Sequence, residues 1–262
     1  MIPLIIILSA LIALYFLFFL ENRRFRTVFT KCEHEKIKTG FRVVQISDLH
    51  DKKFGDRQRK IVSAIREAKP DYIAITGDLF NRRKHSACQN AFRLIHEVQK
   101  IAPVCFVEGN HEIAMQGTGE RYMAQITEIG ITVLRNSYFD FSPFRMVGLC
   151  QMVTKEQIAP LLSSERFNLV LSHRPELFDV YVDSGVDVVL CGHAHGGQVR
   201  LGHIGLYAPQ QGLIPKYTSG WYRRWKTEMY VSRGLGNTIP FPRVFNTPEL
   251  NVIDFIPKAK EN

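Results

Sequence analysis

Hydrophobic residues recur along the chain in two alternating patterns, short continuous runs and helical repeats. The runs at 41–47, 72–76 and 103–107 are rich in β-branched and aromatic residues, which is typical of buried strands. Segments 58–69 and 87–100 place apolar residues on one face at helical spacing. This β-α-β-α-β order predicts an α/β domain in which helices cover a parallel sheet.

The second half of the chain continues the alternation. The pattern predicts a helix at 122–129 and strands at 132–134, 144–149, 167–171 and 186–190. Two stacked sheets flanked by helices would bring the strand ends of both halves together.

The N-terminus has a different pattern, because residues 2–20 are apolar apart from Ser9. A helix of this length covers roughly 28 Å, close to the hydrocarbon core of a bilayer, about 30 Å. No basic residue precedes the run and no small-x-small site follows it, which argues against a cleavable signal peptide. We expect a transmembrane anchor at 1–20, followed by a polar juxtamembrane linker at 21–40.

Basic residues flank this run on one side only, at Arg23, Arg24, Arg26 and Lys31. The positive-inside rule then places the large C-terminal part in the cytoplasm. The expected location is the inner membrane, with a single pass.

The net charge of +9 favours anionic partners such as phosphate esters, nucleic acid or acidic lipid surfaces, or else reflects a merely basic solvated face. The five cysteines are odd in number and scattered, and no C-x-x-C occurs. This spacing does not indicate a disulfide framework.

Metal-binding residue types follow the strand-like runs in five places. The five motifs are Asp48-Leu49-His50, Gly77-Asp78, Gly109-Asn110-His111, Ser172-His173 and Gly192-His193-Ala194-His195. In sheets of this kind ligands bind beyond the carboxyl ends of the strands. Each motif alone is weak evidence for a metal site, since ordinary turns and hydrogen-bonded histidines contain the same residue types. The five motifs in this order together predict one metal centre.

Residues i and i+2 of an extended segment point the same way, so Asp48 and His50 can address one metal, and so can His193 and His195. The carboxylate of Asp78 can bridge two cations. A mixed nitrogen and oxygen shell suits Mn²⁺, Fe, Zn²⁺ or Ni²⁺ better than Mg²⁺, and we favour manganese. Two such metals clamp a phosphoryl group and activate a water for attack on phosphorus.

His111 follows Asn110 directly and is predicted to face the substrate. A histidine there can stabilise developing charge or protonate the leaving oxygen.

These motifs resemble the calcineurin-like metallophosphoesterase superfamily over about residues 41–255. The segments 191–198, 231–236 and 246–250 resemble its membrane-associated bacterial branch, some members of which are UDP-2,3-diacylglucosamine diphosphatases of lipid A synthesis. The resemblance implies a four-layer α-β-β-α sandwich and a metallophosphoesterase domain at 41–257.

The resemblance also implies two metal sites that share a bridging ligand, with His111 as the catalytic histidine. One metal would be held by Asp48, His50, Asp78 and His195, and the other by Asp78, Asn110, His173 and His193. One departure is Leu149-Cys150-Gln151, where the branch usually has an acidic residue. That position is not a metal ligand, so it bears on substrate contacts only.

Three arginines are candidate substrate contacts, namely Arg82, Arg83 and Arg233. Arg82 and Arg83 follow Asp78 closely and could grip a second phosphate, or lie in a solvated loop. Segment 221–226 alternates aromatic and basic residues. Such a segment suits a membrane interface, an anionic lipid headgroup or single-stranded nucleic acid, and a locally packed basic loop gives the same pattern.

The sequence thus predicts a membrane-anchored dinuclear-metal phosphoesterase that cleaves a phosphodiester or pyrophosphate bond without a covalent intermediate. A lipid-linked nucleotide such as UDP-2,3-diacylglucosamine, cleaved to lipid X and UMP, is the favoured substrate. A broad-specificity phosphodiesterase or a nuclease is the alternative, with nucleic acid the less favoured partner. An inactive metal-binding scaffold is disfavoured, because all the motif ligands and His111 are present.

Overall fold

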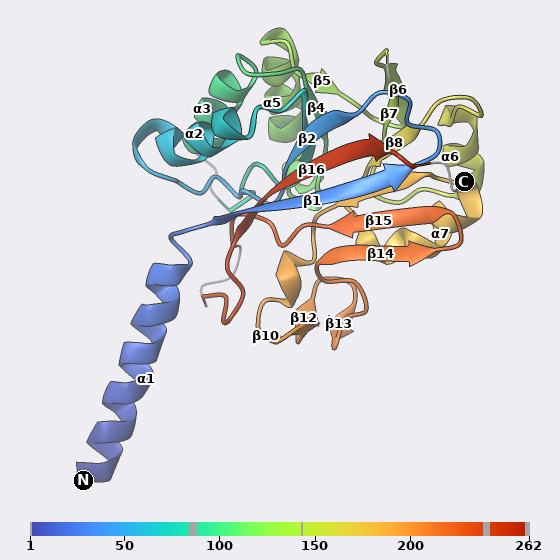
Figure 1. Cartoon of the computed structure of the whole chain (residues 1–262). Helices are drawn as coiled ribbons and strands as arrows, with labels where there is room; N and C mark the ends of the chain where they lie inside the picture. The colour runs from blue at the N-terminus through green and yellow to red at the C-terminus, as the bar shows by residue number, and fades with distance from the viewer. Residues whose placement is uncertain (1, 84–87, 143, 238–241, 260–262) are drawn as a thin grey trace.

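Two six-stranded sheets face each other, and helices cover both outer faces (Figure 1). The computed structural model describes residues 2–83, 88–142, 144–237 and 242–259, with side chains from residue 5 onward. The four-layer α/β sandwich expected from the sequence is the observed architecture.

The first sheet has the order β1-β16-β2-β3-β4-β5. Its strands are β1 (Arg26–His34), β16 (Glu249–Pro257), β2 (Phe41–Ile46), β3 (Tyr72–Thr76), β4 (Val104–Val107) and β5 (Thr132–Val133). Strands β2 to β5 are parallel, as predicted, whereas β16 runs antiparallel to β2. The parallel part therefore carries three motif-bearing strand ends at one edge.

The second sheet has the order β14-β15-β9-β8-β7-β6. Its strands are β14 (Gly220–Arg224), β15 (Thr227–Val231), β9 (Val188–Cys191), β8 (Asn168–Leu171), β7 (Arg145–Gly148) and β6 (Ser137–Asp140). Its four central strands are parallel, and β14 and β6 form antiparallel edges. The remaining strands form two small hairpins: β10 (Arg200–Leu201) with β11 (Ile204–Gly205), and β12 (Tyr207–Ala208) with β13 (Gly212–Leu213).

Three apolar clusters separate the four layers. The first joins the outer face of the first sheet to α2 (Arg59–Ala68), α3 (Gln89–Val98) and α5 (Gly117–Glu128). The second fills the space between the sheets, and the third packs the other sheet against α6 (Lys155–Ile158) and α7 (Phe178–Ser184). Strand residues buried on both faces explain why the strands appear in the sequence as unbroken apolar runs.

Helix α1 (Ile2–Glu21) projects away from the sandwich (Figure 1). Within the described part of the chain, no helix has both the length and the apolarity that crossing a membrane requires. The predicted transmembrane anchor is therefore not supported.

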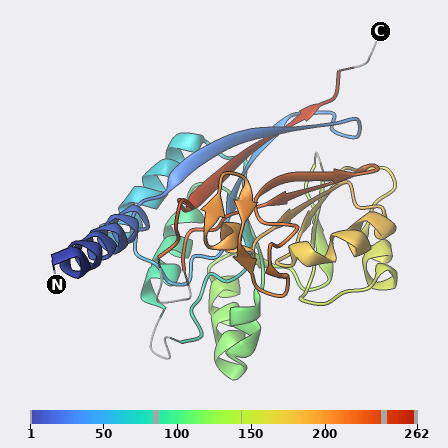
Figure 2. The same ribbon diagram turned by 90° about the horizontal axis from the view of Figure 1, so that it is seen from below.

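Strand β1 corrects the predicted juxtamembrane linker, because residues 26–34 pair in parallel with β16 along their whole length. The sequence pattern missed this strand since it lies at the edge of its sheet and buries few side chains. The small hairpins were also not predicted. Figure 2 shows them, in orange, over the middle of the domain when it is viewed from below, with α1 leaving to one side.

Candidate metal centre

The five sequence motifs meet at one edge of the sandwich, beyond the ends of β2, β3, β4, β8 and β9. Their ligand atoms form three overlapping groups, in each of which the atoms lie within 4.8 Å of one another. The groups are Asp48 with His50 and His195, His50 with Asp78 and His111, and Asp78 with His173 and His193. All of these side chains are buried, so one compact polar centre is enclosed by the fold.

The turns that carry these residues are not extended. Asp48 and His50 both have φ 50°, Asp78 has φ 52°, and His193 and His195 have φ 67° and 47°. The prediction that these segments are extended is therefore wrong here. One of its consequences also fails, because His193 and His195 belong to different ligand groups and do not address one metal. Left-handed conformations are costly for residues other than glycine and collect at functional sites.

Gly77 makes one of these turns possible. Its φ of +86° is unfavourable for any residue with a side chain, and an added Cβ would lie 2.6 Å from the Gly109 nitrogen and 2.7 Å from Nδ1 of His173. Only glycine lets the ends of β3 and β4 approach this closely.

Two pairs of histidines face each other nitrogen to nitrogen. Nε2 of His50 lies 3.3 Å from Nε2 of His195, and Nδ1 of His193 lies 3.0 Å from Nε2 of His173. Burial lowers the pKa of His50 and of His193 to about 3 each, so both rings are neutral at ordinary pH. Burial also holds the pKa of His195 well below the ordinary value, so a cation placed between the neutral rings of His50 and His195 receives a lone pair from each.

The buried carboxylate of Asp78 also requires a positive neighbour. Burial alone would raise its pKa, but the charge of His173, with Nε2 3.3 Å from Oδ2, helps hold the pKa well below the ordinary value. The same attraction outweighs burial at His173 and raises the pKa of that histidine to about 9. The centre therefore favours a positive charge beside Asp78.

Asn110 supplies a further observation. Its Oδ1 is buried and has no hydrogen-bond partner among the described residues. Buried oxygens are rarely left unpaired, and a metal ion would satisfy this one. The donor set of carboxylates, imidazoles and one amide oxygen fits a divalent first-row transition metal.

His111 lies at the start of α4 (Asn110–Ala114), with its ring 4.5 Å from that of His50, centroid to centroid. The backbone N–H of Arg82 donates to its Nδ1 over 3.4 Å. An acceptor role for Nδ1 leaves Nε2 as the protonated nitrogen of the neutral ring. That nitrogen is suited to donating a hydrogen bond to an oxygen on which negative charge develops.

Sequence reasoning missed Glu112. Its buried carboxylate accepts the backbone N–H groups of Asp78 at 2.8 Å, Phe80 at 2.9 Å and Gly109 at 2.7 Å. The side chain thereby fixes the turn after β3 against the turn after β4. A glutamate at the third position of a helix that begins at Asn110 is a capping signal, so the sequence did contain a clue.

Replacing Glu112 with glutamine is expected to lower metal affinity and activity by about 10–100-fold, the usual range for groups that orient metal ligands. The amide NH₂ would oppose a backbone donor that the carboxylate now satisfies. Metal content at limiting Mn²⁺ and the hydrolysis rate would be measured, with the exposed Glu128→Gln as the matched control. Full metal content and wild-type rates in Glu112→Gln would contradict this role.

Two further partners lie behind the histidines. Nη2 of the buried Arg243 is 3.1 Å from Nδ1 of His195, and Oε1 of Gln210 contacts Nε2 of His193. Such partners set the orientation of imidazole rings. Both come from segments that no sequence motif marked.

The three candidate substrate arginines are placed differently. Arg82 and Arg83 follow Asp78 by four and five residues in the sequence, and their side chains are exposed. Arg233 instead lines a separate cavity, where its Nε is 3.2 Å from Oε1 of Glu249. Arg174 was not predicted, yet its Nη1 is 3.4 Å from Nε2 of His193.

Comparison with known proteins gives a consistent result. The family model described as calcineurin-like phosphoesterase matches residues 41–197. The metallophosphoesterase YkuE of Bacillus subtilis is 31% identical over 81% of this chain and 78% of its own. The phosphodiesterase YaeI of Escherichia coli is 30% identical over 82% of each chain.

Among solved structures, TT1561 of Thermus thermophilus superposes with a TM-score of 0.52 at 11% identity. The match covers 75% of this chain and 91% of that one. This likeness concerns the fold alone.

Proposed function

This chain belongs to the calcineurin-like phosphoesterase family, and from that premise we propose that it hydrolyses phosphodiester or pyrophosphate bonds at the centre described above. The enzyme is a metal-dependent phosphoesterase. The observation that carries the proposal is the convergence of buried carboxylates and imidazoles from five separate strand ends.

Two divalent metals, which we propose to be manganese, would occupy this centre. Asp48, His50, Asp78 and His195 would hold one, and Asp78, Asn110, His173 and His193 the other. When bound, such metals neutralise charge on the phosphoryl oxygens and lower the pKa of water. The buried turns hold these ligands in place before substrate arrives, which reduces the reorganisation that the reaction needs.

The protein's own contribution at the leaving group is His111. With Nδ1 engaged by the Arg82 backbone, the Nε2–H of the neutral ring can donate a hydrogen bond to the departing oxygen and stabilise the negative charge that develops there, whereas full proton transfer requires the imidazolium form. We propose Arg82 and Arg83 as contacts for a second phosphate, because they follow the Asp78 turn and their side chains are exposed.

For the physiological substrate we propose a lipid-linked nucleotide, with UDP-2,3-diacylglucosamine, cleaved to lipid X and UMP, as the specific candidate. The support is an apolar surface, since α1 exposes large side chains along its length and the β13 hairpin exposes Leu213. We propose the cytoplasmic face of the inner membrane as the place of action.

A broad-specificity phosphodiesterase is the second candidate. It is favoured by the relative YaeI, which is named a phosphodiesterase. The net charge of +9 also permits nucleic acid as a substrate, and salt-sensitive binding to DNA or RNA would favour a nuclease.

The test is hydrolysis of bis-p-nitrophenyl phosphate and of UDP-2,3-diacylglucosamine by protein purified with Mn²⁺. Chelation of the metals by EDTA is expected to abolish turnover, and added Mn²⁺ to restore it, because the metals supply most of the charge stabilisation. Release of UMP from the lipid substrate would support the specific candidate. Cleavage of bis-p-nitrophenyl phosphate alone would favour the broad-specificity phosphodiesterase. Turnover without metal would contradict both candidate functions.

A further inference from the structure

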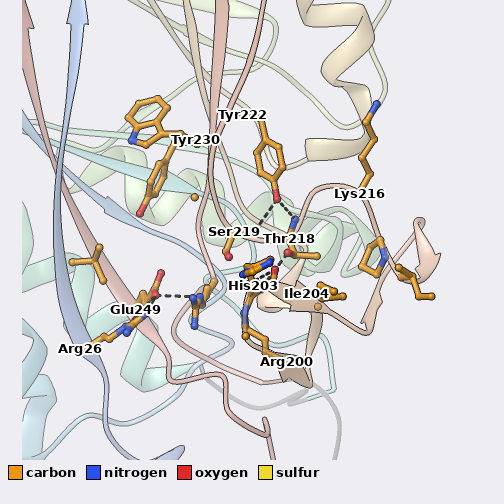
Figure 3. Close-up of a pocket in the computed structure, with 18 residues that line it drawn as sticks. Arg26, Arg200, His203, Ile204, Lys216, Thr218, Ser219, Tyr222, Tyr230 and Glu249 are labelled. Carbon is orange, nitrogen blue, oxygen red and sulfur yellow. Dashed lines mark hydrogen bonds and ion pairs between the residues drawn. The ribbon is translucent and has the colours of Figure 1, made fainter.

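A second cavity lies beside the metal centre, between the β1–β16 edge of one sheet and the β14–β15 edge of the other (Figure 3). Its volume is about 1000 Å³. The β10–β11 hairpin and residues 214–219 form its remaining walls. None of the proposed metal ligands lines it, and neither does His111, so it is a separate site.

The cavity is strongly basic. Arg26, Arg200, Lys216 and Arg233 line it against the single carboxylate of Glu249, which leaves three positive charges in excess. Figure 3 shows Arg26 and Glu249 on one side, with Arg200 and His203 on another. Glu249 is already engaged, because Arg26 Nη2 lies 2.5 Å and Arg233 Nε 3.2 Å from its Oε1.

Arg200 is the most buried of these cations, at 3% exposure. Its guanidinium donates to the carbonyl oxygens of Gly196 and His203 over 2.7 and 2.6 Å, and its Nη1 lies 3.2 Å from Thr218 Oγ1. Its Nε has no hydrogen-bond partner among the described residues. Burial lowers the pKa of Arg200 and of Arg233, because each guanidinium loses hydrating water, and a bound anion would offset that cost.

Aromatic side chains form one wall, with Tyr222 and Tyr230 above Arg26 and Arg200 in Figure 3. The Trp221 ring packs on Tyr230 with a centroid distance of 5.0 Å. The cavity is too large for a bare anion and has flat walls for a larger group. Arginine clusters favour phosphate, because the guanidinium fork matches its oxygens.

We propose that this cavity is a second binding site, separate from the metal centre, for a phosphate group that carries a glycerol- or sugar-sized substituent. The phosphate would sit among Arg26, Arg200 and Arg233, and the substituent against the aromatic wall. The proposal stands on the cavity alone and requires no catalytic turnover. The phosphate can come from a free small molecule or from a lipid headgroup.

The chain offers a local reporter of this site. It has two tryptophans, and Trp225 is 86% exposed at the β14–β15 turn. In Trp225→Phe protein, Trp221 in the cavity wall becomes the sole tryptophan. Its fluorescence would be followed during titration with inorganic phosphate, with phosphatidylglycerol vesicles and with phosphatidylcholine vesicles.

A saturable change with inorganic phosphate, or with phosphatidylglycerol but not phosphatidylcholine vesicles, is the expected result. The first outcome identifies a free phosphate and the second a lipid headgroup. Arg233→Gln in the same background should weaken binding about tenfold, the loss of one charged hydrogen bond. Arg26→Gln provides a second test, and because the Arg26 side chain is 52% exposed this variant is expected to fold.

The matched control is Arg59→Gln, which removes one positive charge from a side chain that is 78% exposed outside the cavity. It should bind like the parent. The proposal is overturned if no titrant gives a saturable change, or if Arg233→Gln and Arg26→Gln bind as tightly as Arg59→Gln.

Discussion

Replacing Asp78 with asparagine is expected to lower the hydrolysis rate by about 10³-fold or more, which corresponds to several kcal/mol of lost stabilisation. Asp78, like His50, belongs to two of the three ligand groups, and its Oδ2 lies 3.8 Å from Nε2 of His50 and 3.3 Å from Nε2 of His173. Removing its charge therefore weakens both proposed metal sites together.

The substitution keeps the shape of the side chain, and Oδ1 can still accept the His111 backbone N–H at 2.8 Å. The fold should survive, so the rate and the metal content at limiting Mn²⁺ can both be measured. Asp56→Asn, at a 60% exposed aspartate, is the matched control. A variant that retains two metals per chain and a rate within tenfold of wild type would refute the bridging assignment.

The second large effect is expected at His111. Changing it to glutamine should lower kcat by about 10²-fold or more, the usual loss when a charge-stabilising donor or a general acid is removed. Metal content should remain unchanged, because His111 is proposed to face the substrate rather than to hold a metal. Exposed His96 on α3, changed to glutamine, is the control.

The leaving group separates the two roles open to His111. A nitrophenolate is a weak base that departs without a proton, whereas an alkoxide needs one. If Nε2 donates the proton, the loss in His111→Gln should be larger for an alkyl diester than for bis-p-nitrophenyl phosphate. An equal loss for both would instead indicate that the ring stabilises charge on the phosphoryl oxygens.

The interior strands could be predicted from the sequence because burial on both faces leaves an unbroken apolar run. The prediction of a strand at 72–76 matches β3, and those at 41–47 and 103–107 match β2 and β4 to within a residue. The edge strands could not be predicted in this way. The sequence of β1 is mostly polar because only one of its sides is covered, and its pairing with β16 joins segments over 200 residues apart.

The candidate centre likewise has some properties that the sequence shows and others that only the tertiary structure decides. Its ligand types and their order are local properties, since each follows directly from the end of an apolar strand. Which ligands share a group is a tertiary property. His193 and His195 are two residues apart, but the left-handed turns send the first toward His173 and the second toward His50.

By itself, the sequence determined the α/β class, the interior strands and the set of residues that form the centre, because hydrophobic periodicity and residue type are properties of short segments of the chain. Only the tertiary structure decided the supporting partners and the basic cavity. Arg243 reaches His195 from 48 positions away, and Arg26, Arg200 and Arg233 meet only because two sheet edges come together. Contacts between distant segments depend on how the layers pack, and that packing leaves no short-range pattern in the chain.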